Sequence, residues 1–392
     1  MSHKLIDHSP DVKKLRDNGY EVEVIGNYLL MHSVPYLNAN KEVVKGTLVS
    51  NVSIANNQVT KPNTHVIHFA GEFPCNIDGT IIRQLQHSSR TTNLTDRIVA
   101  NHSFSNKPAN GYQNYYDKMV QYAEIISAPA RNIAPSVTAR TYKVIESLDD
   151  ESVLNYSDTN SSKAEIEAIN QKLSGLKIGI IGLGGTGSYI LDFIAKTYVG
   201  EIHLYDGDKF LQHNAFRAPG APSLEELNES VLKVDYLYNI YSKMRKHIIT
   251  HGLFINESNV GMLKGLDFVF VCIDKSEIKE LIFKKLEDEG IEFIDTGIGV
   301  ERVDDSLIGM IRTTTSTKNK RDHVWNGCIS FADEENEEYA SNIQIAPLNC
   351  LNATFAVIKF YKLYGVLNDL ENEHHSTYSI NVNQLVSNEI SA

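Results

Sequence analysis

In several short stretches before position 165, apolar residues recur at every second position. Such alternation is typical of strands that bury one face and expose the other. The three clearest stretches are Tyr20–Met31, Gly46–Ile54 and Thr64–Ala70. In Asn114–Ile126, the apolar residues are instead spaced as in a helix. We therefore predict a smaller α+β domain over residues 1–145, followed by a linker over residues 146–165, which are rich in Ser, Asp and Asn.

From residue 166 onward, apolar strand-like runs alternate with stretches of helical period. The predicted strands are Lys177–Ile181, Glu201–Asp206, Leu253–Asn256, Asp267–Asp274, Ile291–Asp295 and Leu307–Thr313. The predicted helices follow the first strand to about Thr197 and cover about Ser230–Ile249, Lys275–Glu289 and Ala346–Tyr364. This alternation predicts an α/β fold over residues 166–392, with a Rossmann-like, doubly wound, mostly parallel sheet. Ligands bind such sheets at the carboxyl ends of the strands.

A glycine-rich turn joins the first of these strands to its helix. Its glycines are Gly182, Gly184, Gly185 and Gly187. A turn without Cβ atoms lets a phosphate approach the backbone, and the first N–H groups of the helix point toward that phosphate. Asp206 ends the next strand, where an acid can hydrogen-bond a ribose hydroxyl. These features predict a nucleotide site, although the glycine turn alone also fits an NAD-dependent oxidoreductase.

Charged and amide side chains follow Asp206, namely Asp208, Asn214, Arg217 and Lys233. Hydride transfer gives no reason for an arginine and a lysine so close to the ribose acid. Cleavage of a triphosphate does, because negative charge builds up on phosphate oxygens and positioned cations stabilise it.

Each charged residue also has a simpler interpretation when it is taken alone. Asp208 fits a turn residue beside a glycine. Arg217 and Lys233 fit solvated surface charges. Asp274 fits the N-cap of the helix that follows it.

Taken in order, these features resemble the ubiquitin-activating superfamily, whose simpler bacterial members are ThiF and MoeB. The shared pattern is GxGGxG, DxD, NxxR, a downstream Lys and an Asp that ends the fourth main strand. This sequence supplies Gly182, Gly184, Gly185, Gly187, Asp206, Asp208, Asn214, Arg217, Lys233 and Asp274. The resemblance covers about residues 170–365. It implies a Rossmann-like ATP-binding domain that adenylates the C-terminal carboxylate of a ubiquitin-like protein or a related peptide.

The resemblance also implies a role for each residue. The paired glycines would face the triphosphate, and Asp206 would hold the ribose. Asn214, Arg217 and Lys233 would position the phosphates. Asp274 would help to bind Mg²⁺ near the α-phosphate. The chemistry is consistent with these roles, because a carboxylate that attacks an α-phosphate is an anion meeting an anion, and cations must screen the repulsion.

Many relatives pass the adenylate to a catalytic thiol. Cys328 lies in a long polar segment at the position of the crossover loop that carries the catalytic cysteine in relatives, so we expect it to form a thioester. Its cationic neighbours, which we expect to lower its pKa, are Lys318, Lys320, Arg321 and His323. Cys75 is a weaker candidate. Cys272 and Cys350 are expected to pack in the core, and an incidental free cysteine remains the alternative for Cys328.

Two departures from the family pattern limit the analogy. The CxxC zinc clamp of ThiF and MoeB is absent, so we expect no structural zinc. Relatives also receive an arginine from the partner subunit, placed just before the first strand, whereas Glu165–Leu176 contains no arginine. Either another residue substitutes for it, or the activity is weak. Family members usually dimerise through this domain, so we expect a homodimer.

Length and composition support a protein of two or three domains. The chain has 392 residues and a formal charge of −12, which argues against broad nucleic-acid binding. It has neither a signal-peptide-like start nor an apolar run that approaches the roughly 20 residues needed to span a bilayer. Its four cysteines suggest no disulfide framework. We therefore expect a cytoplasmic protein with no membrane partner.

The N-terminal domain shows no motif from which we can assign it to a family. Its position suggests that it recruits the protein substrate, or that it is conjugating-enzyme-like. We expect ATP and Mg²⁺ as cofactors and a ubiquitin-like protein as substrate. A conjugating enzyme is a further candidate partner. The alternatives are adenylation of a peptide or small acid, an inactive nucleotide-binding scaffold and an NAD-dependent oxidoreductase.

Overall fold

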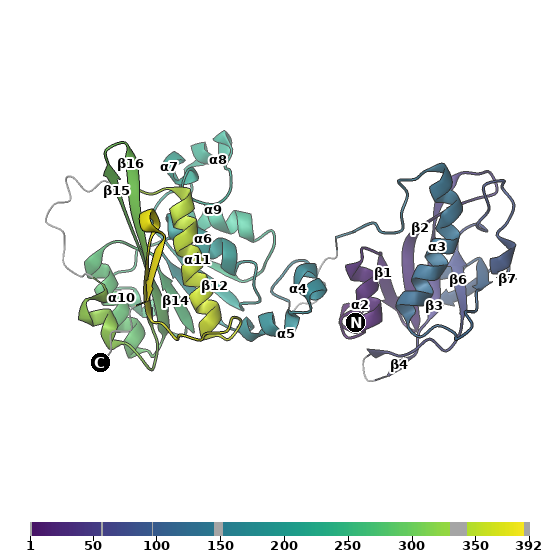
Figure 1. Ribbon diagram of the computed structural model, residues 1–392, viewed down its shortest axis with the longest axis horizontal. Coiled ribbons are helices and arrows are strands. Elements are labelled where there is room, and N and C mark those ends of the chain that lie inside the picture. Colours follow the sequence, from purple (N-terminus) through teal and green to yellow (C-terminus); the bar gives the residue numbers. More distant parts are fainter. Residues whose placement is uncertain (1, 56–57, 96, 145–151, 330–342, 388–392) are drawn as a thin grey trace. The chain divides into compact units, whose positions relative to one another are not determined.

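The computed structural model describes residues 2–55, 58–95, 97–144, 152–329 and 343–387. The chain divides into two compact units, and each is described separately (Figure 1). The first consists of residues 1–150 and 157–164, and the second of residues 151–156 and 165–392. Part of the segment expected to be a linker, Thr159–Ala164, forms helix α4 of the first unit.

The first unit is built on an antiparallel sheet with the strand order β1-β2-β3-β6-β10-β7. These strands are β1 (Val22–Ile25), β2 (Tyr28–Leu37), β3 (Val43–Asn51), β6 (Val66–Ala70), β7 (Gln86–Ser88) and β10 (His102–Ser105). The remaining elements are α1 (Ser2–Asp7), α2 (Pro10–Asp17), α3 (Tyr115–Ile133) and the two hairpins β4–β5 (Ile54–Ala55, Gln58–Val59) and β8–β9 (Thr92–Thr95, Ile98–Ala100). Helix α3 packs on β2 and β3, and the side chain of Asn114 caps its first turn.

The prediction of one strand over Tyr20–Met31 is wrong. Gly26 has a φ of +56°, in the left-handed region that glycine adopts without strain, and the chain reverses there. β1 and β2 therefore form a hairpin, in which Ile25 pairs with Tyr28. Period-two alternation continues through such a turn, so the pattern alone did not reveal it.

A buried lysine holds α3 against the sheet. Lys118 is fully buried, and its Nζ donates hydrogen bonds to Ser50 Oγ and to the carbonyl oxygens of Thr64 and Val66, each at 2.9 Å. Burial lowers the pKa of Lys118 from 10.5 to about 8. The three acceptors are neutral, so the ammonium is hydrogen-bonded but no carboxylate among these partners balances its charge.

Replacing this lysine should change how stability depends on pH. Between pH 8 and 10.5, Lys118 is protonated in the unfolded chain but has lost its proton in the folded protein. The wild-type free energy of unfolding therefore gains on the order of 3 kcal/mol across that window as pH rises. Lys118→Met lacks this gain. Its free energy of unfolding, measured in urea, should therefore fall further below that of the wild type as the pH rises from about 7.5 to about 9.5. The exposed Lys107→Met is the control. A deficit that does not change with pH would contradict this account.

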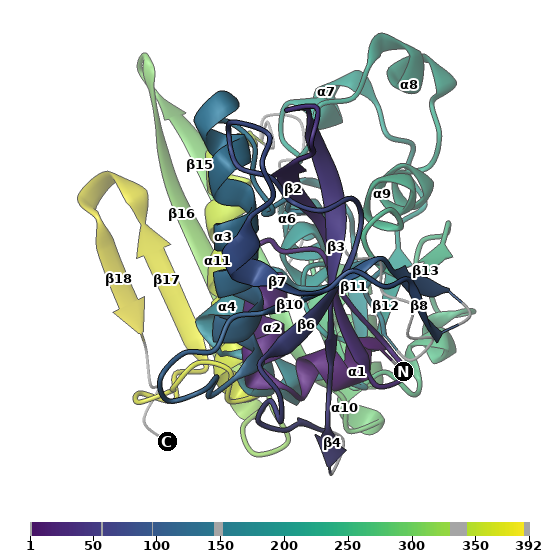
Figure 2. The ribbon, with the colours of Figure 1, turned by 90° about the vertical axis from the view of Figure 1, so that its right-hand side faces the viewer.

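The second unit contains an eight-stranded sheet with the order β13-β12-β11-β14-β15-β16-β17-β18. The strands are β11 (Lys177–Ile181), β12 (Glu201–Tyr205), β13 (Ile248–His251), β14 (Phe268–Val271), β15 (Glu292–Val303), β16 (Ser306–Ser316), β17 (His375–Ser379) and β18 (Gln384–Ser387). The five from β13 to β15 pair in parallel, and β15 to β18 pair antiparallel. β15 and β16 extend as a long hairpin (Figures 1 and 2).

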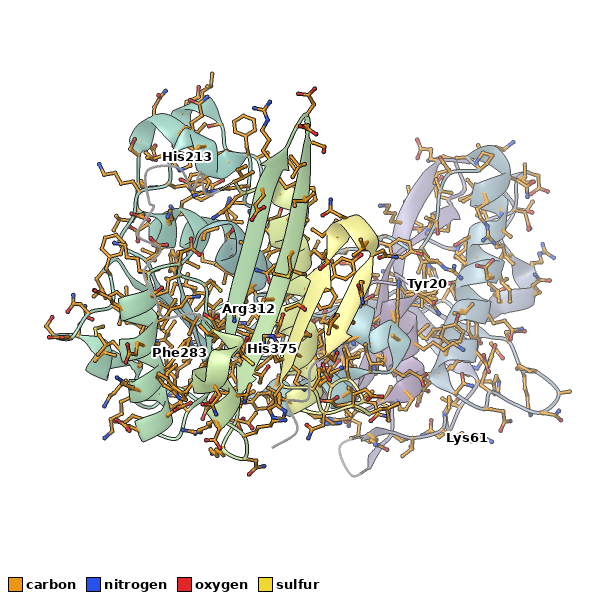
Figure 3. All side chains as sticks on the ribbon, turned by 60° about the vertical axis from the view of Figure 1, so that its left-hand side comes forward. Tyr20, Lys61, His213, Phe283, Arg312 and His375 are labelled. Carbon is orange, nitrogen blue, oxygen red and sulfur yellow. The ribbon has the colours of Figure 1, made fainter. Side chains whose placement is uncertain are left out.

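Helices cover both faces of this sheet, as a doubly wound fold requires. The α-helices are α5 (Glu167–Asn170), α6 (Gly185–Ile194), α7 (Gln212–Ala215), α8 (Leu224–Glu229), α9 (Lys233–Tyr241), α10 (Ser276–Asp288) and α11 (Ala346–Leu363). One core cluster joins the sheet to α6, α9 and α11, and another joins it to α10. On the α10 side, the Phe283 ring stacks on that of Phe293, with ring centroids 4.6 Å apart. Phe283 is labelled in Figure 3. The predicted α/β class is confirmed. Within the described residues, no helix combines the length and apolar character needed to cross a membrane.

The predicted strand at Leu253–Asn256 and the predicted end of the preceding helix at Ile249 are wrong. Helix α9 ends at Tyr241, and the third parallel strand, β13, comes earlier in the chain than predicted. The buried Arg245 donates hydrogen bonds to the carbonyls of Val199 and Gly200, just before β12, and so fixes the segment that precedes β13 beside that strand. Leu253–Asn256 consequently forms a loop at the carboxyl end of β13.

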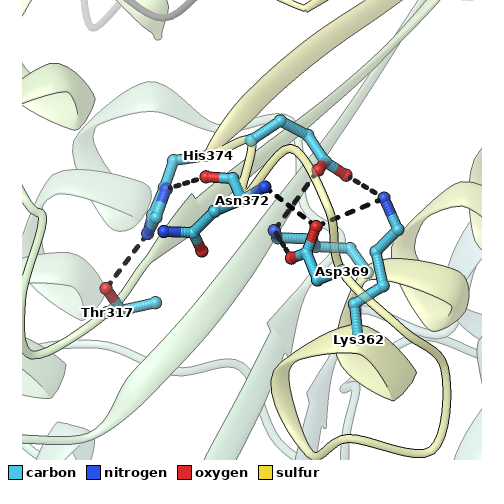
Figure 4. Close-up of polar contacts among 7 residues, drawn as sticks. Thr317, Lys362, Asp369, Asn372 and His374 are labelled. Atoms are coloured by element: carbon cyan, nitrogen blue, oxygen red, sulfur yellow. Dashed lines mark hydrogen bonds and ion pairs between the residues drawn. The ribbon is translucent and has the colours of Figure 1, made fainter.

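Charged residues fasten the end of α11 to the segment before β17 (Figure 4). Lys359 Nζ lies 2.8 Å from Asp369 Oδ2, and Lys362 Nζ lies 2.7 Å from Glu373 Oε1. The neighbouring His374 forms a 3.2 Å hydrogen bond with Thr317 Oγ1. This network fixes α11, whose other half reaches the cavity described next.

Candidate active site

A cavity of about 480 Å³ opens at the carboxyl ends of the parallel strands. Its volume lies within the range of about 300–1,000 Å³ that is typical of small-molecule sites. Its lining residues are Ile181, Gly182, Gly184, Gly185, Thr186, Tyr205, Asp206, Asp208, Arg217, Lys233, Leu253, Phe254, Ile255, Asn256, Cys272, Ile273, Asp274, Lys275, Ile278, Thr296, Ile298, Gln344 and Asn352. The structure thus brings most of the sequence-predicted site residues to one place.

The glycine turn forms one wall, and its glycines serve different purposes. A Cβ at Gly182 would lie 2.6 Å from the carbonyl oxygen of Cys272, and its φ is +86°. A Cβ at Gly187 would lie 1.9 Å from the carbonyl oxygen of Gly182. Gly187 does not line the cavity, so close packing explains it. A Cβ at Gly184 would meet nothing within 4 Å, because that position faces open cavity.

Asp206 organises the turn from the neighbouring strand. It is 6% exposed, and its carboxylate accepts the backbone N–H of Leu183 at 2.7 Å and that of Asp208 at 2.8 Å. Each carboxylate oxygen keeps a lone pair after these bonds. Asp206 therefore fixes the shape of the glycine turn and can still accept a hydroxyl from a ligand.

Lys233 is a buried cation at the start of α9, not the solvated surface charge of the simpler interpretation. It is 6% exposed, and its Nζ lies 2.7 Å from Asp208 Oδ2 and 3.6 Å from Asp206 Oδ2. The side chain of Asp208 is itself half exposed. The two carboxylates hold the ammonium at the cavity wall.

Arg217 lines the cavity, whereas Asn214 does not. The Nε of Arg217 is buried and has no hydrogen-bond partner among the described residues. Asn214 is buried, and its Oδ1 accepts the backbone N–H of Leu211 at 2.8 Å. Its carbonyl also accepts the N–H of Arg217. Asn214 thus shapes the turn that presents Arg217, and an unpaired buried donor at Arg217 fits an anionic ligand.

Asp274 lines the cavity in the short connection between β14 and α10. The N-cap of α10 is Lys275, so Asp274 is not the helix cap of the simpler interpretation. No group of three or more His, Cys, Asp or Glu side chains suited to a metal occurs in the described part of the chain. Mg²⁺ in nucleotide sites is usually held by one or two carboxylates plus phosphates. The exposed carboxylate of Asp274 therefore fits Mg²⁺ bound together with a nucleotide.

The cysteines differ from expectation in one respect. Burial raises the pKa of Cys328 and outweighs the opposing effects of Arg312 and Lys320, so the expectation of a lowered pKa is wrong. Cys328 does not line the cavity and ends the short segment Val324–Cys328, in which Asn326 and Gly327 leave the helical conformation. Residues 330–342 of the expected crossover loop lie outside the described residues.

The remaining thiols are no better activated. Burial raises the pKa of Cys272 to about 12, as expected of a packed thiol, although this residue also borders the cavity. Cys75 is buried, its pKa is raised by burial, and its Sγ lies 3.3 Å from the carbonyl oxygen of Phe73. It is the only cysteine of residues 1–145. The N-terminal unit therefore lacks an exposed thiol of the kind that a thioester carrier uses.

Sequence reasoning missed two parts of the wall. Phe254 lines the cavity from the loop after β13. Its ring lies against Gly207, so that a Cβ added to Gly207 would be 2.8 Å from ring carbons. The amide side chain of Asn352, on α11, lines it beside Thr186. The rule that ligands bind at the carboxyl ends of strands offered a signal for the first, since Phe254 follows a parallel strand. No local pattern indicated the second.

Two family models match this chain. Residues 159–388 match the model of the ThiF family, and residues 10–159 match a domain described as "Domain of unknown function (DUF6791)". The first match covers more than half of the chain, so the chain belongs to the ThiF family.

Individual relatives are distant. "Adenylyltransferase and sulfurtransferase UBA4" of Saccharomyces cerevisiae is 27% identical over 138 residues, which is 33% of this chain and 30% of the yeast protein. "Ubiquitin-like modifier-activating enzyme 5" of Culex quinquefasciatus is 24% identical over 155 residues, which is 36% of this chain and 37% of that protein. A crystal structure of E. coli MccB with ATP is 17% identical and covers 56% of this chain and 65% of that chain, with a TM-score of 0.46. The chain thus spans about a third of the length of the curated relatives, and family membership supports adenylation as the class of reaction.

Proposed function

We propose that this protein activates a carboxylate by adenylating it with ATP. A carboxylate oxygen attacks the α-phosphorus, the bond from that phosphorus to the oxygen bridging to the β-phosphate breaks, and pyrophosphate leaves. The products are an acyl adenylate and pyrophosphate. The observation that carries this proposal is that one cavity is lined by the open glycine turn, Asp206, Arg217, Lys233 and Asp274.

The residues that line the cavity have different proposed roles, which follow from their charge. Gly184 leaves room for phosphate oxygens at the start of α6, where helix N–H groups are unpaired. Arg217 and Lys233 would stabilise the charge that builds up on the phosphates, and Asp206 would accept a ribose hydroxyl. Asp274 would hold Mg²⁺, which supplies positive charge beside the phosphates when bound. An oxidoreductase would leave the Nε of Arg217, which is unpaired among the described residues, without a purpose.

For the acceptor, we propose the C-terminal carboxylate of a ubiquitin-like protein. The resemblance to ubiquitin-activating proteins supports this choice, and one relative is named for activating such a modifier. We further propose that residues 1–145 recruit that protein and that the enzyme works as a homodimer in the cytoplasm. Because Glu165–Leu176 contains no arginine, another cation of the dimer would replace the arginine that relatives receive from the partner.

The test is a labelling experiment on the whole chain. The protein is incubated with α-labelled ATP, Mg²⁺ and ubiquitin-like proteins encoded beside its gene, and intact masses are recorded. AMP should appear on the C-terminal residue of one candidate, and a copy of that candidate without its last residue should stay unlabelled. If the chain labels small acids or peptides instead, the ubiquitin-like assignment fails. If it binds ATP and never releases pyrophosphate, it is a scaffold and not an enzyme.

A thioester at Cys328 is the further step that we propose. The thiolate would attack the acyl carbon and AMP would leave. Because burial raises the pKa of Cys328, formation of the thioester should accelerate with rising pH. Cys328→Ala should abolish a dithiothreitol-sensitive band on non-reducing gels, while the matched Cys350→Ala keeps it. A band that survives in Cys328→Ala would show that the thiol was chosen wrongly.

A further inference from the structure

Asn352 presents an unusual group to the cavity. Its side chain lines the wall and is 1% exposed, yet its Oδ1 is buried without a hydrogen-bond partner among the described residues. A buried acceptor without a partner costs free energy, and native proteins rarely leave one empty. In a cavity wall, such an atom points to a donor on the ligand.

Neighbouring bonds fix which end of this amide is free. The carbonyl of Arg217 can only accept, so Asn349 must present its Nδ2 to it, at 3.2 Å. Asn349 Oδ1 then accepts the hydroxyl of Thr186 at 3.4 Å. The oxygen of that hydroxyl accepts Asn352 Nδ2 at 3.3 Å. The chain of bonds therefore runs in one direction, and the group left over at Asn352 is an acceptor.

This acceptor excludes some ligand groups. Phosphate oxygens and a carboxylate have no proton to donate at neutral pH, so neither satisfies it. A ribose hydroxyl, the adenine amino group and a peptide N–H do. Asn352 is bonded to Thr186, which directly follows Gly185 at the phosphate side of the turn, whereas Asp206 offers its lone pairs from β12. The donor expected near the phosphates is the one attached to the acyl substrate.

We propose that Asn352 Oδ1 accepts the backbone N–H of the residue that carries the reacting carboxylate. This inference rests on the proposed function and assigns a side chain that recognises its acyl substrate. The amide nitrogen lies two covalent bonds from the carboxyl carbon, so it arrives beside the phosphates whenever the carboxylate does. The cavity therefore selects acids whose α-nitrogen is part of an amide, as at a protein or peptide C-terminus, over simple small acids.

Two stable adenylate mimics test the proposal. N-acetylglycyl sulfamoyladenosine has the amide N–H, and acetoxyacetyl sulfamoyladenosine has an ester oxygen in its place. By isothermal titration the wild-type chain should bind the amide about tenfold more tightly, the value of one hydrogen bond to a buried acceptor. In Asn352→Leu this preference should vanish, and in Thr186→Val, which removes the support for the amide, it should shrink. ATP, whose phosphates carry no donor at neutral pH, should bind the wild type and Asn352→Leu equally.

The possible results distinguish failure of the Asn352 role from failure of the proposed function. Equal affinity of the wild type for both mimics, which requires no variant to fold, would overturn the role of Asn352. So would a preference that persists in Asn352→Leu. Weaker binding of ATP to Asn352→Leu would overturn it too, because the donor would then be the ribose or the adenine. No binding of ATP to the wild type would instead overturn the proposed function.

Discussion

Arg217→Ala is expected to slow substrate-dependent ATP–pyrophosphate exchange by about 10²–10³-fold, the typical loss when one positioned donor to a developing charge is removed. The physical reason is specific to this side chain. Its buried Nε has no partner among the described residues, so it costs free energy in the empty cavity and recovers that cost only when an anion arrives. Exchange is measured with labelled pyrophosphate and the acceptor identified by the labelling experiment.

The control is Arg302→Ala on the β15–β16 hairpin, whose side chain is 72% exposed. Its ion pair is a solvated one, so exchange should be unchanged. Thermal unfolding should be similar for both variants, because Arg217 forms no ion pair with another described residue whose loss would destabilise the fold. Exchange by Arg217→Ala within about threefold of the wild type would contradict the phosphate-binding role, since one lost phosphate contact should cost far more.

The second large effect is expected from a pair of glycine substitutions. Gly187→Ala would place a Cβ 1.9 Å from the carbonyl oxygen of Gly182, and both atoms belong to the backbone, which cannot yield cheaply. We expect it to destabilise this unit by about 3–5 kcal/mol. Gly184→Ala meets nothing within 4 Å and should fold normally.

The two glycine substitutions should also be distinguished by ATP binding. The Cβ added at Gly184 points into the cavity where phosphate oxygens approach, so ATP affinity should fall at least about tenfold in a chain that is still folded. Urea unfolding followed by Trp325, the only tryptophan, reports on the second unit, and titration calorimetry reports ATP binding. A Gly187→Ala chain as stable as the wild type, or a Gly184→Ala chain with wild-type ATP affinity, would contradict the structure of the turn.

The sequence predicted the site residues that lie on consecutive strand–helix segments. The glycine turn, Asp206 and Lys233 lie on segments that follow one another through successive parallel strands, so the order of elements was enough to bring them together. Arg217 lines the same cavity for the same reason. Asn214 does not line it and its side chain shapes the turn that presents Arg217, so its role in positioning the phosphates stays a prediction.

What was missed depends on contacts between distant segments. Asn352 reaches Thr186 across 166 positions of sequence, and only the packing of α11 on α6 brings them together. The pKa of Cys328 was misjudged because sequence shows nearby cations but not burial. The position of β13 depends on Arg245 contacting the start of β12, again a contact that periodicity does not encode.

The central claim is that this cavity binds the triphosphate of ATP. Titration calorimetry of the intact chain with ATP and Mg²⁺, with NAD⁺ in a parallel experiment, tests it most directly. We expect saturable binding of ATP, a raised melting temperature in its presence and no such effect of NAD⁺. ATP binding should be lost when Arg217 and Lys233 are both replaced by Met. Binding of NAD⁺ in preference to ATP, or ATP binding unchanged in the double variant, would contradict the claim.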